Sequence, residues 1–175
     1  MPIRFGTDGW RGIIADDFTF ANVQLCAQGV CSLLKARGQD AAGVVIGYDT
    51  RFGSTAFADA VAEVTAANGI KTFLADRPAP TPVMSYNVIA KGAGGGVIIT
   101  ASHNPQQWNG FKFKPAYGSS ATQDIIDDLE RHIEDAEASE GLARIPVYQA
   151  EREGLVERGK GRDQFERHRK CASVA

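Results

Sequence analysis

The residues with the clearest chemical potential lie in one short segment, TASHNPQQWNGFKFK, residues 100–114. It follows a glycine-rich run and the apolar residues 97–99, which indicate a buried strand. Just after that strand the segment places the hydroxyl of Ser102 beside the imidazole of His103, and Lys112 follows. In open α/β sheets, ligands bind at the carboxyl ends of the strands. The segment therefore predicts a functional loop centred on Ser102.

Two kinds of chemistry suit a serine hydroxyl at this place. A hydrolytic nucleophile needs a base, but neighbouring residues of an extended chain point in opposite directions, so proton transfer to His103 is not assured. The GxSxG pattern of serine hydrolases is also missing from the sequence. A phosphoryl carrier would bring about two negative charges and would need cations nearby. We favour this second interpretation, with four candidate cations: Arg11, Arg51, Lys112 and Lys114.

Other patterns in the 175-residue chain favour structural or surface roles. The run GAGGG matches neither the P-loop nor the Rossmann spacing. His132 and His168 have no second ligand at metal spacing. A net charge of −2 gives no reason to expect nucleic acid or a membrane surface as partner, and no apolar run approaches the roughly 18 residues of a membrane span. Three cysteines without CxxC spacing indicate free thiols and a cytoplasmic location.

Strand-like and helix-like segments alternate along the chain. The patterns predict helices at 19–37, 53–68, 82–90 and 120–138, and strands at 43–48, 70–75, 96–100 and 110–114. Thr19 is the expected N-cap of the first helix, and Ser54 or Thr55 that of the second. This order is typical of a three-layer α/β/α sandwich with a mixed, mostly parallel sheet.

We place the domain at residues 1–140. Residues 141–175 contain few apolar side chains, several glycines and scattered charges of both signs. They indicate a linker or a frayed basic tail. Interleaved acidic residues and the lack of alternating aromatics argue against a nucleic-acid arm there.

Four motifs, in order, resemble the phosphoglucomutase/phosphomannomutase family, the α-D-phosphohexomutases. They are FGTDGWRG (5–12), GYDTR (47–51), APTP (79–82), and TASHNP with NGFK (100–105 and 109–112). The resemblance covers residues 3–140 and extends more loosely to 158. Trp10 and the TASHNP form point away from the related phosphoglucosamine mutases.

The resemblance implies an activity, the interconversion of sugar 1-phosphates and 6-phosphates through a phosphoserine and a bisphosphorylated sugar. By matching position, Ser102 would be that serine, and its phosphate would complete the coordination of Mg²⁺. Lys112 would be the general acid or base, with Arg11 as a second candidate, and His103 and Asn104 would support the loop. Arg11, Asn104 and Lys112 would contact the hexose phosphate substrate. Glucose 1,6-bisphosphate is implied as an activator.

The chain is much shorter than the family pattern, which has four domains. It lacks the DGDxDR-type loop that supplies aspartates to Mg²⁺, the sugar-selecting GExSG-type loop and a C-terminal phosphate-binding loop. We therefore expect the isolated chain to fold with negligible mutase activity and to self-associate through the exposed domain-docking face. A truncation, a shifted reading frame and a deliberately expressed domain all stay open. The alternative function is a stand-alone, non-catalytic phosphoserine module that binds a sugar phosphate or a partner protein.

Overall fold

A computed structural model describes residues 3–6, 8–139 and 141–159 of the chain. Within these residues one sheet has the strand order β1-β5-β4-β2-β3-β6. Neighbours β4, β2, β3 and β6 pair in parallel, and β5 runs antiparallel to both β1 and β4. The mixed, mostly parallel sheet is confirmed. The strands are β1 (Trp10–Ile13), β2 (Val44–Tyr48), β3 (Thr72–Ala75), β4 (Gly95–Ile99), β5 (Trp108–Pro115) and β6 (Val156–Gly159).

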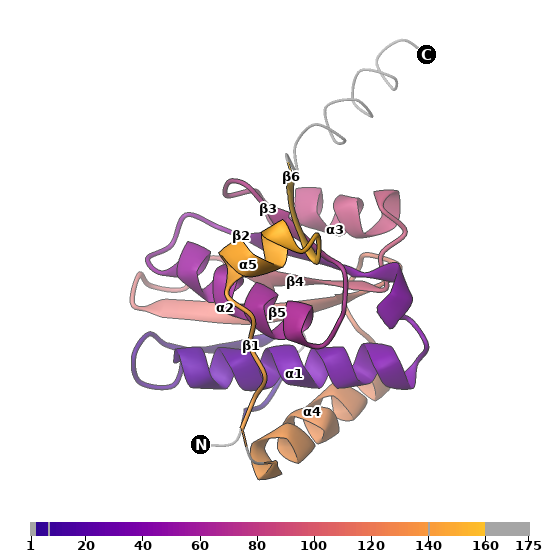
Figure 1. Ribbon diagram of the computed structural model, residues 1–175. Coiled ribbons are helices and arrows are strands. Elements are labelled where there is room, and N and C mark those ends of the chain that lie inside the picture. The colour runs from indigo at the N-terminus through magenta and orange to yellow at the C-terminus, as the bar shows by residue number, and fades with distance from the viewer. Residues whose placement is uncertain (1–2, 7, 140, 160–175) are drawn as a thin grey trace, which may run out of the picture.

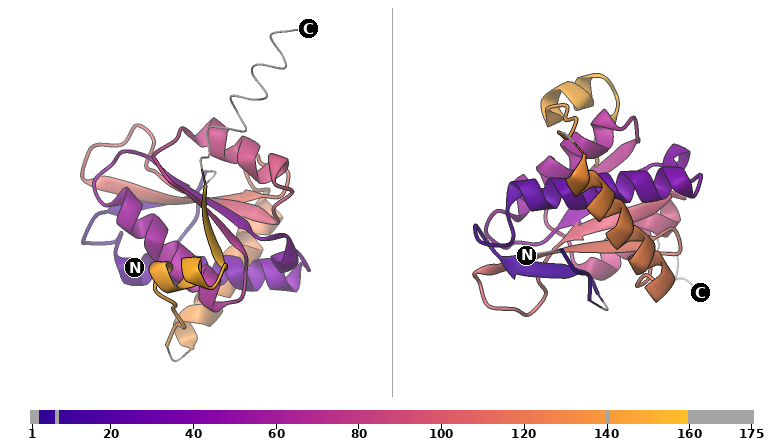
Figure 2. Two further views of the ribbon diagram at one scale, coloured as in Figure 1. Left: turned by 45° about the horizontal axis from the view of Figure 1, so that its top comes forward. Right: turned by 90° about the horizontal axis from the view of Figure 1, so that it is seen from below.

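Helices cover both faces of this sheet (Figure 1). On one face, α1 (Phe20–Ala36) packs beside α2 (Ser54–Ala67), and on the other, α3 (Thr81–Ala90) packs against β2 and β4. The acidic helix α4 (Gln123–Ala138) lies across α1, as the right view of Figure 2 shows. β2 and β4 are buried at every position because helices cover them on both sides. The three-layer α/β/α sandwich is confirmed.

The helix starts follow two different rules. Thr19 caps α1 as predicted, because its side chain accepts a hydrogen bond from the Asn22 N–H. The predicted cap of α2 is wrong, since Gly53 occupies that position with a φ of +75° and without a side-chain bond. Ser54 is fully buried instead, and its hydroxyl is engaged by residues of the functional site described below.

Two strands near the site differ from the sequence prediction. Residues 10–13 form β1, which is not among the strands that the sequence predicted. Trp10 anchors this strand by stacking on Phe18 in the core, with ring centroids 4.9 Å apart. β5 spans eight residues, longer than the predicted 110–114. Arg11 and Lys112 therefore both lie on strands, at the antiparallel end of the sheet.

The chain beyond residue 140 contributes to the same sheet. The short helix α5 (Val147–Arg152) packs against α2, and β6 pairs in parallel with β3. Buried Ala150 and Val156 hold this unit in place. These residues were expected to be linker because so few of them are apolar. The remainder of the predicted tail of 141–175, residues 160–175 with His168 and Cys171, lies outside the described residues. None of the described helices is long and apolar enough to cross a membrane.

Candidate functional site

Three predicted cations lie on one face of the β1–β5 pair. Arg11 is opposite Gly110 in the strand register, and Lys112 and Lys114 follow Gly110 at two-residue steps. Alternate residues of a strand point to the same face, so these side chains share the face covered by α3. A Cβ at Gly110 would lie 3.1 Å from Cγ of Arg11 and 2.6 Å from the Thr100 carbonyl oxygen. Glycine is therefore favoured at this position of the NGFK motif, because an added Cβ would collide with the Thr100 carbonyl oxygen and would crowd the Arg11 side chain.

One carboxylate, that of Asp8, neutralises both lysines. Lys112 donates to Oδ2 of Asp8, and Lys114 donates to Oδ1 at 3.0 Å. The two lysine side chains are only 6% exposed, whereas that of Asp8 is 37% exposed. Burial by itself raises the pKa of Asp8, but the hydrogen bonds from Lys112 and Lys114 outweigh it and hold the pKa below its ordinary value. Asp8 is thus a charged bridge over two buried ammonium groups.

The glycine after Asp8 allows this bridge to form. Gly9 has a φ of +103°, and a Cβ there would lie 2.5 Å from the Phe111 carbonyl oxygen and 3.0 Å from Lys112 Cα. The N–H of Gly6 donates to the Gly9 carbonyl oxygen at 3.0 Å, which closes a tight turn. The turn lies directly on β5 and brings Asp8 over the lysines. The order of residues in FGTDGW therefore sets the geometry of the cationic face.

Ser102 lies in the loop after β4 with a left-handed backbone, at a φ of +55°. Such a conformation is uncommon for a residue with a Cβ and is typical of functional sites. Its N–H donates to Oγ1 of Thr100 at 3.0 Å, and the residue is exposed. It lines an open cleft of about 730 Å³ between the loops that follow β2, β3 and β4. The other lining residues are Asp49, Thr50, Arg51, Phe52, Ala79, Pro80, Thr81, Thr100, Asn104 and Gln106.

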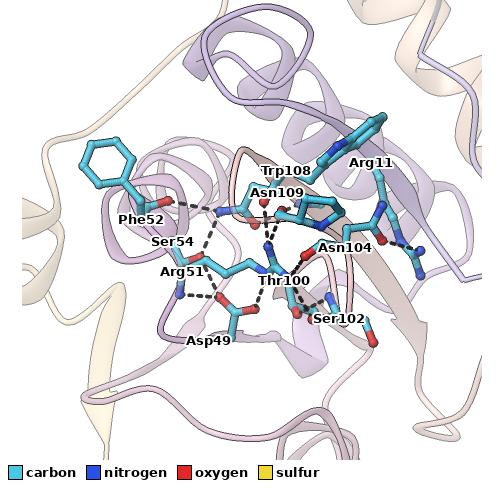
Figure 3. Close-up of polar contacts among 12 residues, drawn as sticks. Arg11, Asp49, Arg51, Phe52, Ser54, Thr100, Ser102, Asn104, Trp108 and Asn109 are labelled. Carbon is cyan, nitrogen blue, oxygen red and sulfur yellow. Dashed lines mark hydrogen bonds and ion pairs between the residues drawn. The ribbon is translucent and has the colours of Figure 1, made fainter.

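Arg51 gathers the backbone of the Ser102 loop around its guanidinium group (Figure 3). Nη2 donates to the carbonyl oxygens of Ser102 at 2.8 Å and Asn104 at 2.6 Å. Nη1 donates to those of Pro105 at 3.0 Å and Trp108 at 3.1 Å. The sequence pointed to Arg51 as a cation for phosphate, but in the structure its terminal nitrogens contact main-chain oxygens.

A network of side chains holds Arg51 on the side opposite the Ser102 loop. Oδ2 of Asp49 lies 3.4 Å from Nε of Arg51, while Oδ1 accepts from the Arg51 N–H and from the Ser54 hydroxyl. Asn109, fully buried, donates to the same hydroxyl at 2.9 Å and accepts from the Gly110 N–H. The network joins the end of β2 to the start of β5. Sequence reasoning missed Asp49 and Asn109, although both fall in motifs that it quoted, GYDTR and NGFK.

The two remaining predicted site residues, Asn104 and His103, differ in their contacts. Asn104 accepts a hydrogen bond from Nη1 of Arg11 at 2.9 Å, so it links the cationic face to the Ser102 loop. His103 is exposed, and within the described part of the chain no hydrogen bond to its imidazole is formed. The structure therefore does not pair it with Ser102 as a base.

The side chains of the described residues do not make a donor set that fits a divalent metal by itself. Among residues 3–6, 8–139 and 141–159, no group of three or more His, Cys, Asp or Glu side chains could hold a metal ion. Mg²⁺ is usually held by carboxylates, phosphate oxygens and water. Asp49, whose carboxylate lines the cleft, is already engaged by Arg51 and Ser54. These residues can supply an exposed hydroxyl group, a rigid loop that carries it, and positive charge.

Comparison with known proteins agrees with this arrangement. Residues 2–140 match the family model described as phosphoglucomutase/phosphomannomutase, alpha/beta/alpha domain I. A phosphoglucomutase of Staphylococcus saprophyticus is 32% identical over 161 residues, which cover 90% of this chain and 28% of that protein. A probable phosphoribomutase of Schizosaccharomyces pombe is 41% identical over 115 residues, 63% of this chain and 20% of that protein.

A solved structure shows the same relation. The crystal structure of a putative phosphomannomutase from Thermus thermophilus superposes with a TM-score of 0.73 at 38% sequence identity. The match covers 91% of this chain and 32% of that one. The chain thus spans between a fifth and a third of the length of these relatives.

Proposed function

Because the chain belongs to the phosphoglucomutase/phosphomannomutase family, we propose that it is the domain of a phosphohexomutase that carries the phosphoryl group, on Ser102. The observation that carries this proposal is the presentation of Ser102. The residue is exposed to a wide cleft while its backbone is held in a left-handed conformation by a dense set of hydrogen bonds. A serine oxygen that must attack phosphorus in one step and leave it in the other needs this combination of access and fixed position.

In the proposed reaction, the bond between Oγ of phosphorylated Ser102 and phosphorus breaks, and a sugar hydroxyl oxygen forms the new bond to phosphorus. The sugar hydroxyl gives its proton to a base, and Oγ of Ser102 takes up a proton as it leaves phosphorus. The bisphosphorylated sugar then returns its other phosphoryl group to Ser102. Lys112 is the proposed proton-exchanging group, a role that requires its ammonium group to leave the ion pair with Asp8, and Arg11 is the second candidate. The hydrogen bond from Arg11 to Asn104 supports a role for Arg11, because it brings a positive charge to the Ser102 loop.

Two further proposals apply to a family protein longer than this chain. Mg²⁺ bound through the phosphate of Ser102 and glucose 1,6-bisphosphate as an activator are proposals for a family protein with all its domains. No step above depends on the metal. The substrate is proposed to be a hexose phosphate, although one relative is named for a pentose. We also propose a cytoplasmic location and self-association of the isolated chain through its domain-docking face.

A chimera tests the proposal directly. Residues 3–159 would replace the matching part of the Thermus thermophilus protein, and conversion of glucose 1-phosphate to glucose 6-phosphate would be measured. We expect turnover by the chimera and its loss, by at least about a thousandfold, in Ser102→Ala. Ser119→Ala, in an exposed turn after β5, is the matched control and should leave turnover unchanged. Full activity of the Ser102→Ala chimera would refute the proposal.

The 175-residue chain alone should show negligible turnover in the same assay. It supplies the phosphoryl carrier and cations, while the described residues offer no carboxylate cluster for a metal. Robust turnover by the purified chain, abolished by Ser102→Ala, would contradict this expectation.

A further inference from the structure

We propose that Arg51 is a positioning residue, which fixes the backbone of the Ser102 loop and does not bind the transferred phosphoryl group. This role in catalysis rests on the proposed function, whereas the contacts of Arg51 are independent of it. A cation beside a phosphoserine is the usual candidate for a phosphate ligand. The contacts of Arg51 point to a different use of its charge.

The hydrogen-bonding capacity of Arg51 is already taken. A guanidinium group has five N–H donors, two on each terminal nitrogen and one on Nε. Each terminal nitrogen donates to two main-chain carbonyl oxygens, and Nε faces a carboxylate oxygen of Asp49 at 3.4 Å. A phosphate oxygen could be bound only by breaking one of these contacts. The N–H donors of Arg51 are therefore already engaged by other groups of the protein.

The same contacts explain how the loop holds an unfavourable shape. Four carbonyl oxygens of residues 102–108 converge on one planar group, and their dipoles would repel one another without a cation between them. Ser102 also adopts a left-handed backbone, which persists only where the surroundings over-determine it. The bond from Arg51 to the Ser102 carbonyl acts on this very residue. The direction of the Ser102 hydroxyl thus depends on Arg51.

Arg51 is itself held on the opposite side. Its side chain is 15% exposed, and Asp49 contacts both its main-chain N–H and its Nε. Because Asp49 is tied to Ser54, and Ser54 to Asn109, the clamp is anchored in α2 and β5. These contacts fix the position of the Ser102 loop relative to the rigid sheet. A lysine at position 51 would keep the charge, but its single ammonium group cannot span four carbonyl oxygens in a plane.

Amide hydrogen exchange in the 175-residue chain tests the inference. The loop amides of Asn104 and Trp108 donate to the carbonyl oxygens of Ala101 and Pro105, so they report the loop directly. In Arg51→Lys and Arg51→Ala we expect both amides to exchange at least about tenfold faster, while the amides of β2 and β4 keep their rates. Arg37→Ala, which removes a surface pair with Asp128 on α4, is the control and should change neither loop amide.

Two further readouts separate positioning from a general structural effect. Guanidinium ion, at a concentration far below denaturing, should restore slow loop exchange in Arg51→Ala, and ammonium at equal ionic strength should not. In the chimera described above, Arg51→Lys should lower kcat by at least about tenfold and leave KM for the sugar phosphate within about twofold. Loop exchange at the wild-type rate in Arg51→Lys, or a raised KM with unchanged loop exchange, would overturn the inference. If the chimera has no activity at all, the proposed function fails, and loop exchange still decides the role of Arg51.

Discussion

The carboxylate of Asp8 should contribute measurably to stability, because it is the counter-ion of two buried lysines. Asp8→Asn keeps the size of the side chain but leaves the ammonium groups of Lys112 and Lys114, each on a side chain 6% exposed, beside a neutral amide. Removing one partner of a buried ion pair costs about 3–5 kcal/mol, whereas an exposed pair is worth about 0–1 kcal/mol. Asp8 itself is 37% exposed, so water screens the pair. We therefore expect a loss of about 2 kcal/mol, between these two limits.

Urea unfolding measures this loss. With a typical slope of about 2 kcal/mol per molar urea, the midpoint should fall by about 1 M at pH 7. Asp16→Asn, which changes an exposed carboxylate in the turn after β1, is the matched control and should move the midpoint by less than about 0.3 M. The double variant Asp8→Asn with Lys114→Met should recover part of the loss, because one of the uncompensated charges is removed.

The pH dependence gives the sharper test. The two lysines lower the pKa of Asp8 in the folded protein from the ordinary value of 3.8, although burial opposes them. A depressed pKa means that the carboxylate stabilises the fold fully above the unfolded value and loses this effect as the pH falls through the folded value. The difference between the wild-type protein and Asp8→Asn should thus be constant from pH 7 to pH 5 and shrink below 3.8. Equal midpoints at pH 7, or a difference that persists undiminished under strong acid, would show that the Asp8 carboxylate is not a stabilising counter-ion of the two lysines.

Two other expectations concern packing and thiol chemistry. Gly110→Ala should lower the free energy of unfolding by about 2–3 kcal/mol, because its Cβ would lie 2.6 Å from the Thr100 carbonyl oxygen. Gly38→Ala, where φ is +65° and nothing lies within 4 Å of the added carbon, should cost only about 1 kcal/mol in the same urea titration. Burial raises the pKa of the Cys31 thiol to about 12 and raises that of Cys26 as well. Peptide mass spectrometry after iodoacetamide treatment at pH 8 should therefore show both thiols labelled at least about a hundredfold more slowly in the native protein than in urea.

The sequence was most informative where one periodic pattern dominates. Helices α1 and α4 and strands β2 and β4 match their predicted segments closely, because burial on a face or on both faces leaves a clear apolar pattern. Strand β1 was missed because its apolar signal is limited to a few residues between glycines. Strand β6 was missed because it lies at the sheet edge, where only Val156 is buried.

The site was predictable by residue type and only partly by geometry. The cluster of Arg11, Lys112 and Lys114 follows from strand alternation once β1 is known. The bridge from Asp8 could not be foreseen, since it depends on a turn that Gly9 folds back onto β5. The role of Arg51 could not be foreseen either, because a sequence gives its charge but not the carbonyl oxygens that surround it. Contacts between distant segments of backbone leave no periodic signal.

The measurement that tests the central claim most directly is the location of the phosphoryl group. The chimera would be incubated with radiolabelled glucose 1,6-bisphosphate, digested, and its phosphopeptides mapped by mass spectrometry. We expect label on the peptide that contains Ser102, released again when a sugar phosphate is added, and no label on this peptide in Ser102→Ala. Turnover with an unlabelled Ser102 peptide, or labelling of another residue at the rate of catalysis, would contradict it.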